Sequence, residues 1–330
     1  MDNISGPSIL KGTPLAGQAG DTDQPTETSH EHSKFRTLII NPAASHTHTF
    51  IILHGRGSNG PKFGTEFAAS STATGETLPD IFPSAKWIFP TATKRRAVLF
   101  KRMPINQWFD IYDINNQTYR EHLQVDGLQE TTAFVHGLIE EEIRNGIPAD
   151  RIVVGGLSQG CAASLYAMLC YKQRLGGYFG MCGWLPFAKY VEEFVGTPLS
   201  EDGTKIDDVF GASEDEEGTT FEDKEEVDTK ENKKDPAFEA IGFLKDNITF
   251  PKSQEDTLAV FQTPVFLGHG VLDEKVPFRL GEQARDALVG LGFKTTWKAY
   301  DDLGHWYKVP DEIDHIRDFL RDALSTTAGG

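Results

Sequence analysis

The chain has 330 residues, of which 38% are hydrophobic and 25% charged, and its formal net charge is −17. This length and apolar content allow one large α/β core, whereas the acidic balance disfavours binding to nucleic acid, which needs clustered cations. No segment approaches the ~20 apolar residues of a membrane span, and residues 1–5 lack the features of a secretory signal. Three cysteines are too few for a disulfide framework, so we expect a soluble protein of the reducing cytoplasm.

The first 34 residues are rich in Gly, Thr, Ser, Asp and Gln, which predicts a disordered tail over residues 1–34. The folded domain is expected over residues 35–325, and its first clear strand is the apolar run 48–53. A glycine-rich loop follows, in which we interpret His54 as a structural, hydrogen-bonded residue. The loop glycines allow close backbone approach, so the N–H of Arg56 is a candidate donor to an anionic oxygen.

Two basic groups, residues 94–96 and 101–102, are expected in a loop before Trp108. Such a loop is either simply solvated or guides an anionic head group or an anionic membrane surface. An amphipathic helix is predicted over residues 124–144, with Leu128, Val135 and Ile139 on its apolar face. We interpret that face as core packing.

The pattern Gly-Leu-Ser-Gln-Gly at residues 156–160 follows a β-branched run at 151–154 and precedes a small-residue helix. Glycines two positions on either side of Ser158 let the chain turn sharply and lift the hydroxyl clear of the backbone. Ser158 is therefore a candidate nucleophile, with the backbone N–H of Gln159 as a donor to the oxyanion. The alternative is a glycine-rich connection that merely exposes a serine.

Two further strands with polar loops follow in the order that a nucleophilic serine in such a sheet requires. The run 263–270 predicts a buried strand, and Asp273 comes in the loop after it, before a helix at 278–291. The alternating run 294–300 predicts a second strand, whose loop carries His305 ahead of a helix at 310–324. His305 is then the general base and Asp273 orients it. The alternative for His305 is an ordinary surface-loop histidine.

Residues 201–235 contain fifteen acidic residues and five lysines, more than half of the chain's net negative charge. This segment cannot bury enough apolar surface to fold alone, so we predict an acidic, low-complexity insertion at 199–257 that interrupts the domain. It is interpreted as a solvated spacer, with a lid edge or a site for a basic partner as alternatives.

Six motifs follow one another along the chain: Leu53-His54-Gly55, Trp108-Phe109-Asp110, the elbow turn 156–160, Gly183-Trp184-Leu185-Pro186, the acid loop 269–273 and His305. In this order they resemble the acyl-protein thioesterase and lysophospholipase-type carboxylesterase family of α/β-hydrolases. The resemblance covers residues 48–195 and 258–323. It implies an α/β-hydrolase fold with a mainly parallel sheet flanked by helices, a triad of Ser158, Asp273 and His305, and an oxyanion hole from the amides of Arg56 and Gln159. The chain departs from the pattern at Arg56, Cys161, Trp306 and Tyr307, and this leaves the substrate open.

These observations predict a serine hydrolase that cleaves carboxylic esters or thioesters through an acyl-serine intermediate, without a cofactor. The aromatic residues Trp108, Phe109, Trp184 and Trp306 are expected to bind the acyl substrate, although Trp184 also suits core packing. Two alternatives remain, a ligand-binding or interaction protein on the same scaffold and a small-ester carboxylesterase with a narrowed pocket. The resemblance implies lipidated proteins or lysolipids as substrates. Histidine pairs at 30/32 and 46/48 lack suitably spaced partners, so no metal site is expected.

Overall fold

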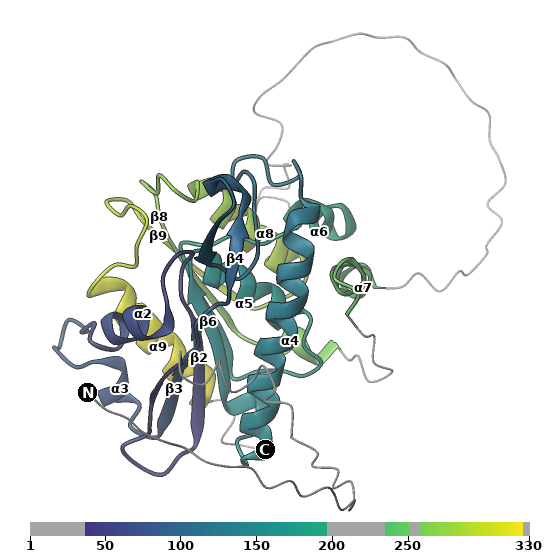
Figure 1. Cartoon of the computed structure of the whole chain (residues 1–330). Coiled ribbons are helices and arrows are strands. Elements are labelled where there is room, and N and C mark those ends of the chain that lie inside the picture. The colour runs from purple at the N-terminus through teal and green to yellow at the C-terminus, as the bar shows by residue number, and fades with distance from the viewer. Residues whose placement is uncertain (1–36, 197–234, 251–257, 326–330) are drawn as a thin grey trace, which may run out of the picture.

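The computed structural model describes residues 37–196, 235–250 and 258–325, and it is built on a seven-stranded sheet (Figure 1). The strands lie in the order β1-β3-β2-β6-β7-β8-β9. Their bounds are β1 Leu38–Ile40, β2 His48–Leu53, β3 Ala85–Phe89, β6 Ile152–Leu157, β7 Gly177–Met181, β8 Val265–Gly270 and β9 Thr295–Tyr300. All neighbouring pairs are parallel except β1 with β3 at one edge. The predicted α/β fold with a mainly parallel sheet is confirmed.

Helices cover both faces of the sheet and give two separate apolar clusters. One cluster includes residues of the helices α4, α5, α6, α7 and α8, with bounds His122–Arg144, Gln159–Leu169, Ala188–Val195, Pro236–Asn247 and Phe278–Gly290. The other includes residues of α2, α3 and α9, with bounds Gly60–Ala68, Leu78–Ile81 and Asp311–Ser325. Figure 1 shows α2 and α9 on one side of the strands and α4 and α8 on the other. No helix in the described ranges combines the length and apolar content that crossing a membrane requires.

The register of the central strands brings their carboxyl ends to one edge of the sheet. Leu53 at the end of β2 is paired with Gly156 near the end of β6, and Leu157 is paired with Met181 at the end of β7. Met181 is in turn paired with Gly268 of β8. The loops that follow these strands therefore meet above one edge, which is where parallel α/β sheets place their sites.

The basic segment before Trp108 is a hairpin rather than the loop expected from the sequence. Strand β4, Lys94–Ala97, is antiparallel to β5, Met103–Asn106, and the two form a separate two-stranded sheet. Val98–Phe100 forms a 3₁₀ turn between them. The backbone N–H of Val98 donates to both carboxylate oxygens of Asp110, at 3.2 Å each, and this anchors the hairpin. Three of the four residues of β4 are charged, and β5 contains a proline, so neither strand carries the apolar alternation by which a strand is recognised.

The predicted tail 1–34 lies outside the described residues, as does most of the predicted insertion 199–257. Within that insertion, however, the structure describes α7, which the sequence did not lead us to expect. The side chain of Asp235 accepts a hydrogen bond from the N–H of Ala237, and Pro236 occupies the first turn. Ala240, Ile241 and Leu244 are buried against the body of the domain. The proposed domain boundaries remain a prediction.

Candidate active site

Ser158 stands at a strained turn between β6 and α5. Its backbone has φ 58° and ψ −121°, an unfavourable combination for a residue other than glycine. The turn is held by a hydrogen bond of 2.8 Å from Ser158 N–H to Met181 O. It also requires small neighbours, because a Cβ at Gly156 would lie 2.5 Å from the carbonyl carbon of Gly160. The close packing therefore fixes the position of the Ser158 hydroxyl at the edge of the sheet.

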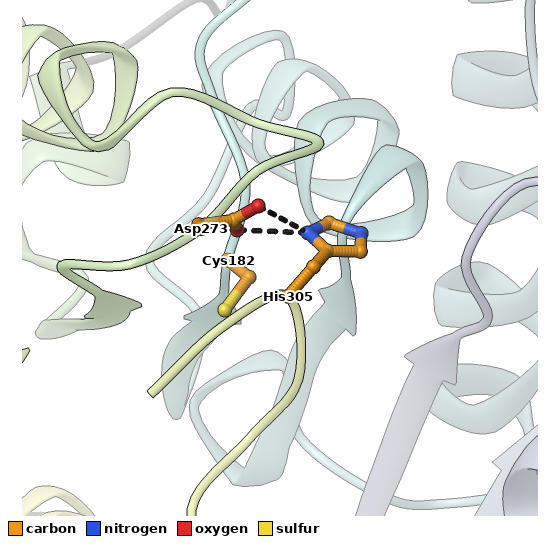
Figure 2. A group of neighbouring side chains, drawn as sticks. All are labelled: Cys182, Asp273 and His305. Atoms are coloured by element: carbon orange, nitrogen blue, oxygen red, sulfur yellow. Dashed lines mark hydrogen bonds and ion pairs between the residues drawn. The ribbon is translucent and has the colours of Figure 1, made fainter. Parts of the chain in front are cut away.

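The structure brings Ser158, Asp273 and His305 together in one hydrogen-bonded row. The Nε2 atom of His305 lies 2.9 Å from Ser158 Oγ. Its Nδ1 atom lies 3.0 Å from Asp273 Oδ1 and 2.8 Å from Oδ2, and Figure 2 shows the ring and the carboxyl group facing each other. With Nδ1 protonated toward the carboxylate, Nε2 is left to accept the hydroxyl proton of Ser158.

Asp273 is held as a charged carboxylate beneath the histidine. Its Oδ1 accepts hydrogen bonds from the N–H groups of Lys275 and Val276, at 2.8 Å each. Burial alone raises the pKa of Asp273, but hydrogen bonds from His269, His305 and the Val276 N–H outweigh it and hold this pKa well below its ordinary value. An ionised carboxylate at this position orients His305 and stabilises its cation.

Cys182 is a further polar neighbour of the histidine and the aspartate (Figure 2). Its Sγ and the nearest ligand atoms of Asp273 and His305 all lie within 4.8 Å of one another. The thiol donates to Trp306 O at 2.9 Å, and burial raises the pKa of Cys182 well above its ordinary value. Metal ligation here would require a thiolate and would break the bonds between His305 and Asp273, so the arrangement suits proton transfer better.

Two backbone N–H groups are available beside the serine hydroxyl. The loop after β2 lies directly against the elbow, since a Cβ at Gly55 would lie 3.4 Å from Ser158 Cβ. Within the described part of the chain, the N–H of Arg56 has no hydrogen-bond acceptor. Gln159 begins α5, and N–H groups in the first turn of a helix have no intrahelical partner. Both N–H groups therefore remain candidates for oxyanion donors.

The side chain of Gln159 and the indole of Trp108 tie this loop to the elbow. Gln159 Oε1 accepts from the Trp108 N–H at 3.1 Å, and its Nε2 donates to Phe109 O at 2.8 Å. Trp108 Nε1 donates to His54 O at 2.7 Å. His54 is itself hydrogen-bonded through both ring nitrogens, to Gly55 O and from the Ala92 N–H, and burial lowers its pKa to about 4. His54 is therefore a neutral structural residue.

A cavity of about 620 Å³ opens onto Ser158 and His305. Of the four predicted substrate-binding aromatics, Trp184 and Trp306 line it. Trp108 and Phe109 are not among its lining residues, because both are buried behind the wall and hold Gln159 in place.

Several apolar lining residues were not identified from the sequence. They come from the β4–β5 hairpin and the segment after Asp110, and they are Leu99, Phe100, Met103, Ile105, Ile111 and Ile114. The only signal available for them was a series of apolar residues in a charged and polar stretch. That signal does not show which side chains face a cavity.

The family model described as phospholipase/carboxylesterase matches residues 36–200 and 230–324. The chain belongs to the phospholipase/carboxylesterase family. The two matched ranges include Ser158, Asp273 and His305, and they leave out only residues 201–229 of the acidic stretch between them. Membership of this family and the α/β-hydrolase fold identify the protein as a serine hydrolase of carboxylic esters or thioesters.

Individual relatives carry consistent names. The chain is 28% identical over 289 residues to acyl-protein thioesterase 1 of Gibberella zeae, covering 87% of this chain and 95% of that protein. It is 38% identical over 156 residues to acyl-protein thioesterase 1 of Schizosaccharomyces pombe, covering 47% of this chain and 64% of that protein. The crystal structure of Zea mays acyl-protein thioesterase 2 is similar, with a TM-score of 0.58 and 28% identity over 88% of this chain and 99% of that one.

Proposed function

We propose that Ser158, His305 and Asp273 are the catalytic triad of this family member, and that the N–H groups of Arg56 and Gln159 form its oxyanion hole. The observation that carries the proposal is the His305 imidazole, hydrogen-bonded to Ser158 Oγ at 2.9 Å and to Asp273 Oδ2 at 2.8 Å. A neutral imidazole between a hydroxyl and a carboxylate is the arrangement that activates a serine.

In the first half of the reaction, Ser158 Oγ attacks the acyl carbon while His305 Nε2 takes its proton. The carbonyl oxygen becomes an oxyanion, which the two N–H groups stabilise, and Asp273 stabilises the imidazolium. The intermediate then collapses, the bond to the alkoxide or thiolate leaving group breaks, and His305 returns its proton to that group.

In the second half, water attacks the acyl carbon of the acyl-serine while His305 takes a proton from it. The bond from the acyl carbon to Ser158 Oγ then breaks, His305 returns the proton to Ser158, and the carboxylic acid is released.

The proposed substrates are acyl thioesters on proteins or acyl esters of lysolipids. The lining of apolar side chains from the β4–β5 hairpin and the segment 111–114 supports an acyl chain in the cavity, and the named relatives are acyl-protein thioesterases. A small-ester carboxylesterase is the competing proposal, supported by Trp306 at the cavity beside His305.

We also propose transient contact of the β4–β5 hairpin with an anionic membrane surface. Leu99, Phe100 and Met103 are 50%, 42% and 59% exposed, and Lys101 and Arg102 lie on the same hairpin. Exposed apolar side chains beside cations are suited to a bilayer surface with anionic lipids. Flotation with vesicles of neutral or anionic lipid tests this, and binding that does not depend on anionic lipid would contradict it.

A cytoplasmic location is retained as part of the proposal. It is supported by Cys161, Cys170 and Cys182, which are buried thiols and form no disulfide in the described part of the chain. Localisation of the tagged full-length chain by microscopy and fractionation tests it, and recovery from a secreted fraction would refute it.

The triad is tested with Ser158→Ala and a fluorophosphonate probe. The variant should lose covalent labelling and nearly all ester and thioester turnover, because only oxyanion-hole catalysis remains. Ser164→Ala is the matched control. Ser164 lies on the helix that follows the elbow, and its hydroxyl donates a hydrogen bond to Cys161 O at 3.1 Å, so it is not bonded to His305. Normal turnover in Ser158→Ala would end the proposal.

The substrate class is tested with 4-nitrophenyl esters of increasing acyl length, with detergent and solubility controls. An acyl-binding cavity should raise kcat/KM with each added methylene over the short chains, because each buried methylene contributes ~0.8 kcal/mol. We expect a maximum at medium length. A steady decline from acetate onward would support the small-ester carboxylesterase instead.

A further inference from the structure

The side chain of Arg56 lines the cavity that opens onto Ser158, and part of its guanidinium group is buried there without a partner. Its Nη1 atom is buried and donates no hydrogen bond to any acceptor in the described part of the chain. The Cζ atom lies 5.2 Å from the centroid of the Phe100 ring, a cation–π contact with the hairpin. The backbone N–H of the same residue is one of the two proposed oxyanion donors, and Arg56 lines the same cavity as Ser158.

The acidic group that most affects Arg56 is Asp110, but the two side chains form no ion pair in the described residues. The Asp110 carboxylate instead accepts hydrogen bonds from the N–H groups of Val98 and Ile111, at 3.2 and 3.1 Å. Burial lowers the pKa of Arg56 and the charge of Asp110 raises it. A guanidinium group keeps its charge at neutral pH in any such environment.

The other charged residues at the cavity do not neutralise this cation. They are Lys62, Lys275 and Glu66, so the described lining holds three cations and one anion. A partly buried guanidinium that lacks hydrogen bonds is costly, and the cost is removed by a group that accepts two of its N–H bonds at once. Carboxylate and phosphate groups match this planar fork.

We propose that the Arg56 side chain is an anion-binding subsite that recognises a carboxylate or phosphate group carried by the substrate close to the scissile carbonyl. This inference rests on the proposed function and narrows its substrate class to anionic esters or thioesters. The anion can be on the leaving group or on the acyl group, and each position is tested separately.

Two matched pairs of substrates distinguish an anion on the leaving group from an anion on the acyl group. S-octanoyl-N-acetylcysteine and S-octanoyl-N-acetylcysteamine differ by one carboxylate on the leaving thiol. The 4-methylumbelliferyl monoester of adipic acid and the 6-methylheptanoate ester differ by one carboxylate on the acyl group. We expect the wild-type protein to favour the charged member of one pair by about tenfold or more in kcat/KM, as a charge-assisted hydrogen bond would give.

Variants of Arg56 assign the preference to its side chain. Arg56→Met keeps a long side chain without charge and should bring the ratio of the charged to the neutral substrate close to one. Arg56→Lys keeps the charge without the planar fork and should retain part of the preference. Lys62→Met is the matched control, because Lys62 is an exposed cation of the same cavity, and it should change the ratio by less than about twofold.

The neutral substrate of each pair is the internal reference, and fluorophosphonate labelling reports whether each variant retains a formed site. Equal rates for both members of both pairs in the wild-type protein would overturn the subsite, even if Arg56→Met failed to fold. An undiminished preference in a labelled Arg56→Met protein would also overturn it. Absence of hydrolysis and labelling in the wild-type protein would instead remove the proposed function itself.

Discussion

The elbow that carries Ser158 and the β4–β5 hairpin face the same cavity, yet they are built in opposite ways. Every residue of β6 and of α5 is buried. In the hairpin, by contrast, Met103 is 59% exposed and Leu99 50%. The elbow is held by backbone contacts that tolerate no added atom, whereas the hairpin presents long side chains to solvent.

This difference separates two requirements of a hydrolase. Proton transfer needs donor and acceptor held near 3 Å, which close packing supplies. Acyl chains vary in length and shape, and exposed long side chains can adjust to them. We therefore expect changes near the elbow to affect the chemical step or stability, and changes in the hairpin to affect substrate preference.

The largest expected effect in the packed region is that of Asp273→Asn. The amide oxygen can still accept hydrogen bonds from the N–H groups of Lys275 and Val276. A neutral amide, however, neither stabilises the His305 cation nor selects the His305 tautomer that is protonated on Nδ1. We expect kcat to fall about 10⁴-fold. Asp302→Asn in the loop before His305 is the control, because Asp302 is exposed and pairs only with Lys308 among the described residues. A loss of less than about tenfold in Asp273→Asn would argue against the proposed triad.

The next effect is structural and comes from Gly160→Ala in the elbow. An added Cβ would lie 2.5 Å from His54 O, against backbone that cannot move without displacing β2. We expect a loss of about 2–3 kcal/mol in unfolding free energy by denaturant titration, together with reduced kcat. Gly137→Ala in α4 is the control, since a Cβ there meets nothing within 4 Å, and it should be neutral or stabilising. Equal behaviour of the two variants would show that the elbow is not closely packed.

A third effect concerns Glu312, a fully buried carboxyl group near the base of the His305 loop. Its Oε2 accepts the Lys308 N–H at 3.0 Å, its Oε1 is buried without a partner, and burial raises its pKa to about 8. Below its ordinary pKa of 4.5 the group is neutral in both the folded and unfolded states. Between the two values only the folded state keeps the proton, so the unfolding free energy should fall as pH rises toward 8.

The side chain introduced by Glu312→Gln cannot ionise, so the unfolding free energy of this variant should not show that decrease with pH. Relative to the wild-type protein, the unfolding free energy of this variant should rise by about 4 kcal/mol between pH 5 and pH 9, because the wild-type carboxyl group loses its proton at pH 4.5 in the unfolded state and near pH 8 in the folded state. Denaturant titrations across this range measure the difference. A difference that does not change with pH would mean that the wild-type carboxyl group is already ionised in the folded protein.

The smallest expected effect is in the hairpin. The double variant Leu99→Gln, Met103→Gln should lower kcat/KM for octanoyl esters about fivefold relative to acetyl esters, because apolar contact with the chain is lost. Its unfolding free energy should change by less than about 0.5 kcal/mol, since both side chains are exposed. Ile39→Gln on β1 is the control, with 47% exposure and no place in the cavity lining. A large loss of stability in the double variant would mean that the hairpin packs as the elbow does.

The sequence determined the positions of Ser158, Asp273 and His305 because each depends on local rules applied in order. Glycines at 156 and 160 specify the turn, and the other two residues follow runs with a clear strand pattern. Once those strands are parallel, their carboxyl ends must share one edge, so the loops meet without further information. The helices at 122–144 and 278–290 were predictable for a similar reason, since apolar periodicity marks a helix that covers a sheet.

Only the tertiary structure decided which side chains face the cavity and which lie behind it. Trp108 and Phe109 are aromatic residues in one of the family motifs, but hydrogen bonds with Gln159 and His54 hold them behind the cavity wall. The hairpin and α7 lie in or beside charged stretches, and their charge led us to expect a loop and an unfolded insertion. For α7 the sequence did contain weaker helix signals, which are the capping residue Asp235 and the apolar residues Ala240, Ile241 and Leu244. The periodicity of apolar residues predicts which face of a helix or strand is buried. It does not predict which residues that face contacts, because those contacts depend on how elements distant in the sequence pack together.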